Sequence, residues 1–311
     1  MKVSAIITTH NRCDLLKRAI DSVFKQTYKD IECIVIDDNS TDETKKYMEK
    51  KIKENSKLRY IRNENPNMSG GGFARNLGIK ESKGEYIAFL DDDDEWFADK
   101  IEKQVSILDE NKDVGIVICG RRIEYNSGKM YLEENPIDRG IKDYSKKILY
   151  NIIGVTSMMM FRKALLEKVG LFDEKIRFWQ EYDLTIRLCQ ISKVAFLNEP
   201  LILYRINLQD KNRKSNQFEG WLETTRYIYN KYKELIEKLN ENEKKCVTLL
   251  VYHDAVNRCD NMGDKKKKRK YLREIYRIQP TLKNYIKYFI NVDRGNIIRL
   301  KLKLNWRKEN V

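Results

Sequence analysis

The chain has 311 residues, a formal net charge of +14 and 41% hydrophobic residues. This length is enough for one large domain with a substantial buried core, followed by an additional segment. The six cysteines form no CxxC pair, which argues against a disulfide framework or a zinc site and favours reduced thiols. No apolar run approaches the roughly 20 residues of a membrane span, so we expect a cytoplasmic protein.

Strands and helices are expected to alternate over the first 110 residues. Short β-branched or apolar runs predict strands at residues 3–8, 31–36, 58–61 and 86–90. Apolar residues at helical spacing and first-turn acids predict helices between them, at residues 13–24 and 44–52. Alternation of this kind predicts an α/β fold with a mainly parallel sheet covered by helices.

The pattern changes beyond residue 113. Further strands are predicted at residues 114–123, 157–161, 194–197 and 201–206, with a hairpin at 125–131 and a helix at 181–189. From residue 212 onward the chain reads as helices, at residues 218–239, 243–262, 266–277 and 281–290. The alternating segment 298–304 fits a strand or a docked helix. We therefore expect a catalytic domain over residues 1–211 and a basic, mostly helical region over 212–311.

Four consecutive carboxylates, Asp91 to Asp94, directly follow the predicted strand at 86–90. A second acidic pair, Asp37 and Asp38, follows the strand at 31–36 in the same way. Open α/β sheets bind ligands at the carboxyl ends of their strands. Crowded carboxylates repel one another unless a cation neutralises them, and hard divalent cations prefer oxygen ligands. The two acidic strand ends predict one metal-assisted site for a phosphate or sugar phosphate.

Further polar and glycine-rich segments accompany these strand ends. In chain order the set is TTHNR at 8–12, IDDNSTD at 36–42, GGFARNLGI at 71–79, FLDDDD at 89–94, KVGLFDE at 168–174 and WQEYDL at 179–184. In this order and spacing they resemble the family 2 glycosyltransferases over roughly residues 1–206. The resemblance implies a GT-A fold, which is a Rossmann-like, mainly parallel mixed sheet with flanking helices.

The resemblance also implies roles for the residues that would bind a nucleotide-sugar donor. Thr8 and His10 would line the nucleotide pocket, and Asp38 would accept a hydrogen bond from uracil. Asp92 would lie near the ribose. Arg75 would approach the nucleotide or its diphosphate, with a plain surface arginine on a helix as the alternative.

By the same resemblance, Asp91 to Asp93 form the DXD metal-binding motif. Asp93 would bind Mg²⁺ or Mn²⁺ directly and Asp91 would support it, while Asp94 would orient neighbours or cap the following helix. The metal would neutralise charge growing on the departing diphosphate.

An acceptor hydroxyl needs a base to take its proton as it attacks the sugar. The family usually has Glu-Asp at this helix start, with the second residue as the base. Here the pair is Gln180-Glu181, so Glu181 is the predicted base. Asp183 is the runner-up, but two helical steps rotate it by about 200°, and we expect it to support structure. Trp179 could stack on a sugar or belong to the core.

The basic excess lies at the end of the chain, where residues 265–311 hold 16 Lys and Arg against 3 Asp and Glu. Anionic lipid surfaces attract such segments, at about 1 kcal/mol per basic residue. The aromatic residues in this region, among them Tyr285 and Trp306, fit an interfacial surface. We therefore consider peripheral attachment to the inner face of the plasma membrane, with a solvated surface as the alternative. Nucleic acid is not an expected partner.

Together these features predict an inverting, metal-dependent glycosyltransferase that serves cell-surface polysaccharide or glycoconjugate synthesis. It would move one sugar from a nucleotide donor, expected to be a UDP-sugar, to a glycan or lipid-linked acceptor. One alternative is a metal-dependent nucleotidyltransferase. The other is a non-catalytic nucleic-acid- or membrane-binding protein on a decayed transferase domain, which the intact Asp38, Asp91, Asp93 and Glu181 argue against.

Overall fold

The computed structural model describes residues 1–65, 69–125, 130–206 and 217–290. The chain divides into two compact units. The first comprises Met1–Lys129, Glu133–Ser145 and Ile153–Ile206, and the second comprises Met130–Leu132, Lys146–Ile152 and Asn207–Val311.

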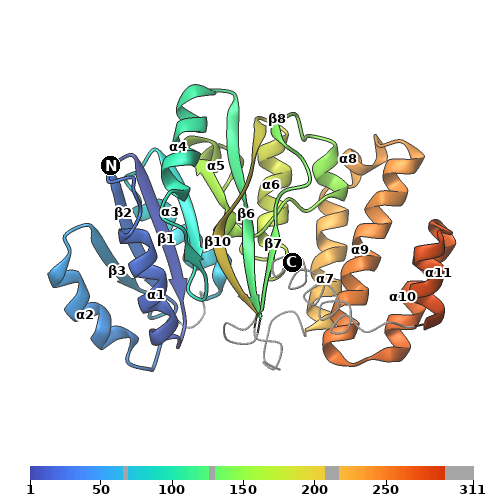
Figure 1. Ribbon diagram of the computed structural model, residues 1–311, viewed down its shortest axis with the longest axis horizontal. Coiled ribbons are helices and arrows are strands. Elements are labelled where there is room, and N and C mark those ends of the chain that lie inside the picture. The colour runs from blue at the N-terminus through green and yellow to red at the C-terminus, as the bar shows by residue number, and fades with distance from the viewer. Residues whose placement is uncertain (66–68, 126–129, 207–216, 291–311) are drawn as a thin grey trace, which may run out of the picture. The chain divides into compact units, whose positions relative to one another are not determined.

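One mixed sheet organises the first unit, with its strands in the order β3-β2-β1-β4-β9-β6-β10-β5 (Figure 1). The four amino-terminal strands are parallel: β1 (Val3–Thr9), β2 (Ile31–Asp37), β3 (Leu58–Arg62) and β4 (Tyr86–Asp91). Strand β9 (Met159–Arg162) runs antiparallel between β4 and β6 (Val114–Tyr125), and β10 (Lys193–Ile206) is parallel to β6. Short strands complete the sheet: β5 (Glu95–Trp96), β7 (Met130–Glu134) and β8 (Gly140–Lys142).

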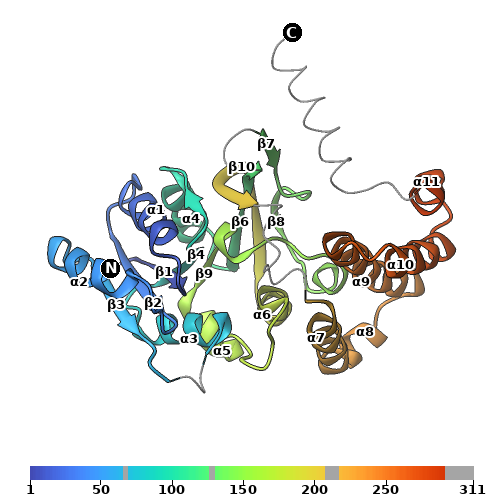
Figure 2. The same ribbon diagram turned by 90° about the horizontal axis from the view of Figure 1, so that it is seen from below.

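Helices cover both faces of this sheet. Figure 2 shows α1 (Cys13–Phe24) and α4 (Lys100–Glu110) on one face, and α3 (Gly71–Glu81), α5 (Lys163–Val169) and α6 (Gln180–Cys189) on the other. Helix α2 (Thr44–Glu54) links β2 to β3, and a 3₁₀ turn, η2 (Thr156–Met158), precedes β9. The predicted α/β class, with a mainly parallel sheet and flanking helices, is confirmed.

The register of the parallel strands brings the polar strand ends together. Thr8 of β1 lies opposite Asp91 of β4, and Thr9 lies opposite Asp37 of β2. The preceding residues of the same strands, such as Ile7 and Leu90, are buried. β1, β2 and β4 are therefore mostly apolar and end in polar residues, so one edge of the sheet gathers the predicted site residues.

The second unit is helical, as predicted for the carboxyl-terminal region. It contains α7 (Phe218–Lys231), α8 (Lys233–Glu237), α9 (Glu241–Met262), α10 (Lys265–Ile278) and α11 (Leu282–Ile290), with the 3₁₀ turn η1 (Lys147–Tyr150) beside α9. Trp221 is fully buried and the Arg258 guanidinium lies 5.0 Å from its ring centroid. Within the described residues, no helix combines the length and apolarity needed to cross a membrane.

Several predicted elements differ from the structure. The helix predicted at 218–239 is two helices, because the backbone leaves the helical region at Tyr232. The strands predicted at 194–197 and 201–206 are one strand, β10, whose register shifts around Pro200, a residue with no N–H to donate. Helices α4 and α5 were not predicted. The hairpin tip at 126–128 and the segment 298–304 lie outside the described residues.

Candidate active site

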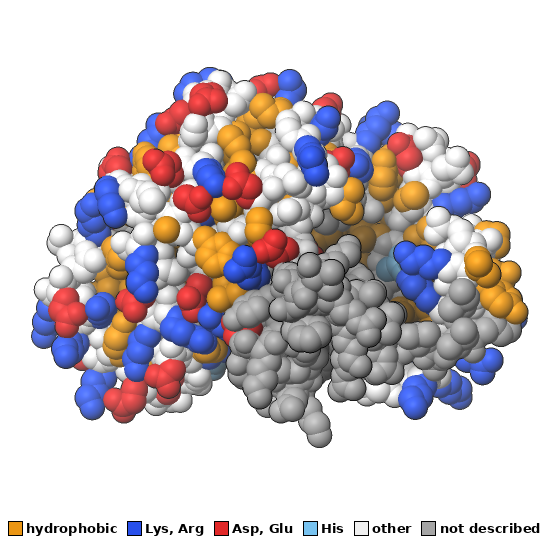
Figure 3. All heavy atoms as spheres, in the orientation of Figure 1, with side chains coloured by type: hydrophobic (Ala, Val, Ile, Leu, Met, Phe, Trp, Pro, Cys, Tyr) orange, Lys and Arg blue, Asp and Glu red, His pale blue; other side chains and the backbone are white. Residues whose placement is uncertain are grey.

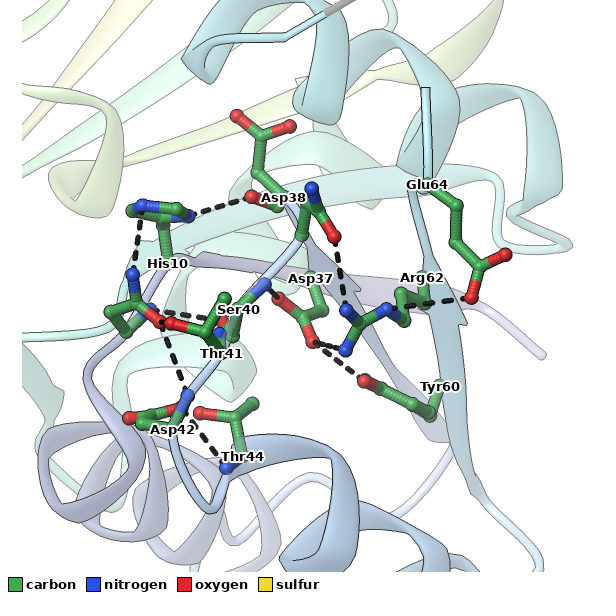
Figure 4. Close-up of polar contacts among 12 residues, drawn as sticks. His10, Asp37, Asp38, Ser40, Thr41, Asp42, Thr44, Tyr60, Arg62 and Glu64 are labelled. Atoms are coloured by element: carbon green, nitrogen blue, oxygen red, sulfur yellow. Dashed lines mark hydrogen bonds and ion pairs between the residues drawn. The ribbon is translucent and has the colours of Figure 1, made fainter. Parts of the chain in front are cut away.

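The loops after β1 and β2 are tied together by side chains (Figure 4). His10 donates from Nδ1 to the carbonyl oxygen of Asp38 at 2.7 Å, and its Nε2 accepts from the Asn11 amide at 3.1 Å. Asn11 does not cap α1. Its Oδ1 instead accepts from the backbone N–H groups of Thr41 and Asp42. His10 itself remains exposed, so the ring is oriented at the sheet edge and accessible to a ligand.

The acidic pair after β2 has two distinct environments. Asp37 is fully buried and accepts from the backbone N–H of Ser40 at 2.8 Å and from the Tyr60 hydroxyl at 2.6 Å, so its role is structural. Asp38 accepts from the Asn63 side-chain amide at 2.9 Å and from the backbone N–H of Gly70 at 2.8 Å. These two donors fix the carboxylate plane, and each oxygen keeps a lone pair that can accept from a bound base.

Asp92 and Asp93 contact residues from the end of β1. The Thr9 hydroxyl donates to Asp92 Oδ2 at 2.8 Å, and Arg12 Nη1 donates to Asp92 Oδ1 at 3.0 Å and to Asp93 Oδ2 at 3.2 Å. Asp92 is only 4% exposed, and burial raises its pKa to about 6 although the Arg12 charge opposes that shift. Both oxygens of Asp92 accept hydrogen bonds from protein donors. The contact of Asp92 with a ribose remains a prediction.

Asp91 is held from the other face of the sheet by Arg75. Arg75 Nη2 donates to Asp91 Oδ1 at 2.7 Å, and Nη1 donates to the Gln180 side-chain oxygen at 2.9 Å. The guanidinium lies 5.7 Å from the Phe172 ring centroid, and the side chain is only 11% exposed. Arg75 is therefore not a surface arginine. It connects the acidic tetrad to the residue that precedes the predicted base.

Glycines at the start of α3 allow this connection. A Cβ on Gly71 would lie 2.9 Å from Arg75 Nη1, and a Cβ on Gly72 would lie 3.1 Å from Gln180 Nε2. The GGFAR segment therefore lacks side chains at the positions where α3 meets Gln180, which leaves space for the Arg75–Gln180 hydrogen bond.

The first turn of α6 carries the predicted base. Glu181 is partly exposed there, whereas Asp183 is fully buried and accepts from Arg187 at 2.6 Å. Arg187 also donates to the carbonyl oxygen of Leu171, so Asp183 belongs to a structural network, as expected. Trp179 is buried and packs edge-on against Tyr182, with ring centroids 5.4 Å apart, which fits the core alternative.

Four non-glycine residues in the described chain have positive φ, and three of them lie in these segments. The four are Asn11 (54°), Asn39 (61°), Leu171 (59°) and Trp179 (55°). A tryptophan in this region is uncommon, and such backbone strain gathers at functional sites. Asn11 and Asn39 lie in the loops after β1 and β2, Trp179 lies at the start of α6, and Leu171 follows the end of α5.

Asp94, the last carboxylate of the tetrad, faces the interior. It is almost fully buried, and burial together with the charges of Asp93 and Asp91 raises its pKa well above the ordinary value. It does not cap the next helix, because α4 begins at Lys100. The tetrad therefore presents Asp91 and Asp93 as its accessible members.

Among the described residues, no three His, Cys, Asp or Glu side chains are arranged to hold a metal ion. Asp91 and Asp93 are 32% and 39% exposed and supply hard oxygen donors. A Mg²⁺-type ion that keeps several waters and takes phosphate oxygens needs only one or two protein carboxylates. The two carboxylates fit an ion held jointly by protein and substrate phosphate.

Most of the predicted site residues lie where the sequence indicated, at the ends of β1, β2 and β4 and at the adjoining start of α3. They are Thr8, His10, Asp38, Arg75, Asp91 and Asp93. Thr9 and Arg12, the residues that contact Asp92, were not predicted as site residues. A basic residue in the loop after the first strand was the available signal, because β1 and β4 are adjacent parallel strands whose carboxyl ends lie at the same sheet edge. Asn63, which orients Asp38, follows β3 in the same way.

Fold and side chains together define an α/β protein with an acid-rich candidate site at the carboxyl ends of parallel strands. The model of glycosyl transferase family 2 matches residues 4–170, and the chain belongs to this family. An uncharacterised glycosyltransferase of Rickettsia prowazekii is 38% identical over 70% of this chain and 69% of its own. The GalNAc(5)-diNAcBac-PP-undecaprenol beta-1,3-glucosyltransferase of Campylobacter jejuni is 28% identical over 79% of this chain and 80% of its own.

Solved structures share the fold. TarS residues 1–349 of S. aureus, in complex with UDP-GlcNAc, has a TM-score of 0.65 at 19% identity and covers 89% of this chain and 81% of its own. The mannosyltransferase PcManGT of Pyrobaculum calidifontis, in complex with GDP-Man and Mn²⁺, has a TM-score of 0.58 at 17% identity and covers 91% and 77%. The resemblance to family 2 glycosyltransferases and the GT-A fold class are confirmed, and the nucleotidyltransferase alternative loses its basis.

Proposed function

We propose that the protein is an inverting, metal-dependent glycosyltransferase that moves a single sugar from a UDP-sugar to a glycan or lipid-linked saccharide. The observation that carries this proposal is the Arg75 bridge. One guanidinium contacts both Asp91 of the tetrad and Gln180, the neighbour of Glu181. This contact supports a single site that holds both the proposed metal motif and the proposed base, as sugar transfer from a nucleotide donor requires.

On this proposal Asp38 accepts from the ring N–H of the uracil, held in place by Asn63 and Gly70. Thr8 and His10 line the same pocket from the end of β1. A Mg²⁺ or Mn²⁺ ion held by Asp93 and supported by Asp91 would supply positive charge against the leaving diphosphate. Arg75 keeps Asp91 oriented for that role.

Glu181 then takes the proton of the acceptor hydroxyl as that oxygen attacks the anomeric carbon. The new glycosidic bond forms while the bond to the diphosphate breaks on the opposite side, so the configuration inverts. A retaining double displacement would need a second carboxylate as the nucleophile. Asp183, the other acid of the first turn of α6, is buried in its pair with Arg187 and is unsuited to that role.

The names of the similar proteins fit this proposal. TarS was solved with UDP-GlcNAc, PcManGT with GDP-Man and Mn²⁺, and the Campylobacter jejuni enzyme is named for an undecaprenol-linked acceptor. We further propose that residues 1–211 carry out the chemistry. Residues 212–311 would serve the encounter with the acceptor at an anionic membrane surface.

A donor screen tests the proposal. Purified protein is incubated with a panel of UDP- and GDP-sugars and lipid-linked acceptors, and release of nucleoside diphosphate is measured with Mn²⁺ and with chelator. We expect release from a UDP-sugar that depends on the metal and on Glu181. Release of pyrophosphate from a nucleoside triphosphate would instead indicate nucleotidyl transfer, and release unaffected by chelator would contradict the metal role.

A further inference from the structure

Two arginines neutralise the acidic tetrad, and their surroundings differ. Arg75 is 11% exposed and is held by Asp91, Gln180 and the Phe172 ring. Arg12 approaches from the opposite side, and its side chain is 48% exposed. Moving Arg75 away from Asp91 would also disturb its contacts with Gln180 of α6 and with the Phe172 ring. Arg12 lies just before α1, at the N-cap position of that helix.

Arg12 shares one nitrogen, Nη1, between two carboxylates. The distances are 3.0 Å to Asp92 and 3.2 Å to Asp93. Asp92 has a second anchor in the Thr9 hydroxyl and is buried, so it keeps its place without Arg12. Asp93 is 39% exposed and is the proposed metal ligand. The Arg12 cation therefore lies directly against the carboxylate that a metal ion would bind.

Charge makes simultaneous binding unfavourable. Two positive charges at contact distance repel each other at a protein surface, and a divalent ion doubles that repulsion. Solvent weakens the repulsion at a half-exposed side chain, but its sign does not change. A divalent ion at Asp93 must therefore displace the guanidinium, which can then turn toward an anion. A diphosphate bound to the same ion is such an anion, and arginine matches its oxygens in two-point contacts.

We propose that Arg12 is an exchangeable counter-ion. In the empty site it neutralises Asp92 and Asp93, and on donor binding it leaves Asp93 and pairs with the donor diphosphate. This inference rests on the proposed function, which it deepens by coupling metal and nucleotide. Because Arg12 competes with the metal and is released to the diphosphate, the metal alone binds weakly. Metal and nucleoside diphosphate then each strengthen the binding of the other by the same factor.

The test measures binding rather than turnover. Mn²⁺ affinity is read from the electron paramagnetic resonance signal of free Mn²⁺, and UDP affinity from calorimetry with and without saturating Mn²⁺. The variants are Arg12→Gln, which removes the charge, and Arg12→Lys, which keeps it. Arg18→Gln is the matched control, because Arg18 lies on α1, the helix that Arg12 precedes, is 45% exposed and faces Glu95 instead of the tetrad. Thermal unfolding of each variant checks that the fold is intact.

We expect Arg12→Gln to bind Mn²⁺ alone more tightly, by about fivefold or more, and to reduce the enhancement of UDP affinity by Mn²⁺ by a similar factor. Arg12→Lys and Arg18→Gln should keep the wild-type Mn²⁺ affinity within about twofold, a change small beside typical coupling factors. Unchanged values in Arg12→Gln, or a loss of both affinities, would overturn the exchange and leave Arg12 as a support for Asp92. Wild-type protein that binds neither Mn²⁺ nor UDP would instead overturn the proposed function, and this inference with it.

Discussion

The guanidinium of Arg75 and the carboxylate of Asp91 form a 2.7 Å ion pair between α3 and the end of β4. The same guanidinium donates to Gln180, which is 105 positions further along the chain. The pair therefore does more than neutralise a charge. It fixes the distance between the acidic tetrad and the first turn of α6, where Glu181 lies.

The Arg75 bridge predicts that Arg75→Lys is not a conservative change. Lysine presents a single point charge and cannot bridge Asp91 and Gln180 in the planar geometry of a guanidinium. Hydrogen bonds to charged groups contribute about 1.5–3 kcal/mol, so kcat/KM should fall by roughly 10- to 100-fold. Arg59→Lys is the control, because Arg59 also pairs with a carboxylate of α3, Glu81 at 2.7 Å. Equal losses in both variants would contradict a specific role for the bridge.

Asp93→Ala should abolish Mn²⁺-dependent donor binding and sugar transfer. The side chain is partly exposed and outside the core, so the free energy of unfolding should change by only about 0.5 kcal/mol. Calorimetry with UDP and Mn²⁺ and a urea titration measure the two quantities. Asp14→Ala is a control on an exposed carboxylate that pairs with Lys17. Full transfer by the wild type in excess chelator would rule out the metal role.

Glu181→Gln should leave donor binding nearly intact and slow the chemical step by roughly 10²- to 10⁴-fold, the usual contribution of a positioned base. Asp183→Asn should behave differently, because it breaks a buried ion pair with Arg187, a change that costs about 3–5 kcal/mol of stability. Single-turnover rates and urea titrations separate the two outcomes. If Asp183→Asn slows chemistry while Glu181→Gln does not, the base assignment is wrong by two residues.

A buried lysine gives a prediction about pH. Lys100 is fully buried, its Nζ donates to Gln104 at 2.7 Å and lies 4.3 Å from the Trp96 ring centroid, and burial lowers its pKa to about 8. An unfolded lysine stays protonated up to about pH 10.5. Between these values the unfolded state binds more protons, so stability rises with pH.

The wild type should therefore gain stability relative to Lys100→Met between pH 8 and 10.5, by up to about 3 kcal/mol. Urea titrations at pH 7, 9 and 10 measure the difference. Lys103→Met on the same helix is the control, because its hydrogen bonds to Asp99 and Glu199 raise the Lys103 pKa. Its contribution is then constant below about pH 10.5. A flat or falling difference for Lys100→Met would show that Lys100 stays charged in the folded protein.

The strands at this edge could be predicted from the sequence because each is a short apolar run with a polar end. The predicted bounds of β1 and β2 each fall one residue short of the observed end, and both acidic groups lie at strand ends as expected. Contacts between distant segments could not be predicted. The Arg75–Gln180 hydrogen bond depends on how α3 packs against α6, which the absence of side chains at Gly71 and Gly72 permits.

Packing also gives residues of the same motif different degrees of burial. Residues 91 to 94 are all aspartates. Asp92 and Asp94 are nevertheless buried, whereas Asp91 and Asp93 are accessible. This division could not be predicted, because Asp94 lies near side chains from distant segments, Ser157 and Arg121. The positive φ of Trp179 likewise has no local signature, because tryptophan does not favour that conformation.

The basic segment at the start of α10 is not uniform, which changes how its role should be tested. Lys268 is buried and pairs with Asp260 at 2.8 Å, and Lys267 pairs with Glu219 at 3.0 Å. Replacing all six residues at 265–270 would damage the fold of the second unit. Lys265, Lys266 and Lys270 are exposed, and Figure 3 shows blue side chains at the lower right, over the helices of this unit.

We predict that Lys265→Gln, Lys266→Gln and Lys270→Gln together weaken binding to anionic liposomes, most strongly at low salt. Each charge contributes about 1 kcal/mol near such a surface, and salt screens this attraction. Donor hydrolysis in solution should change little, because the proposed catalytic groups all lie in the first unit. The control replaces Lys45, Lys46 and Lys50, exposed lysines of α2, with Gln. Equal weakening of liposome binding in both triple variants would mean that the net charge of the protein, and not this segment, governs the encounter with the membrane. Unchanged liposome binding in the first triple variant would mean that the segment is a solvated surface.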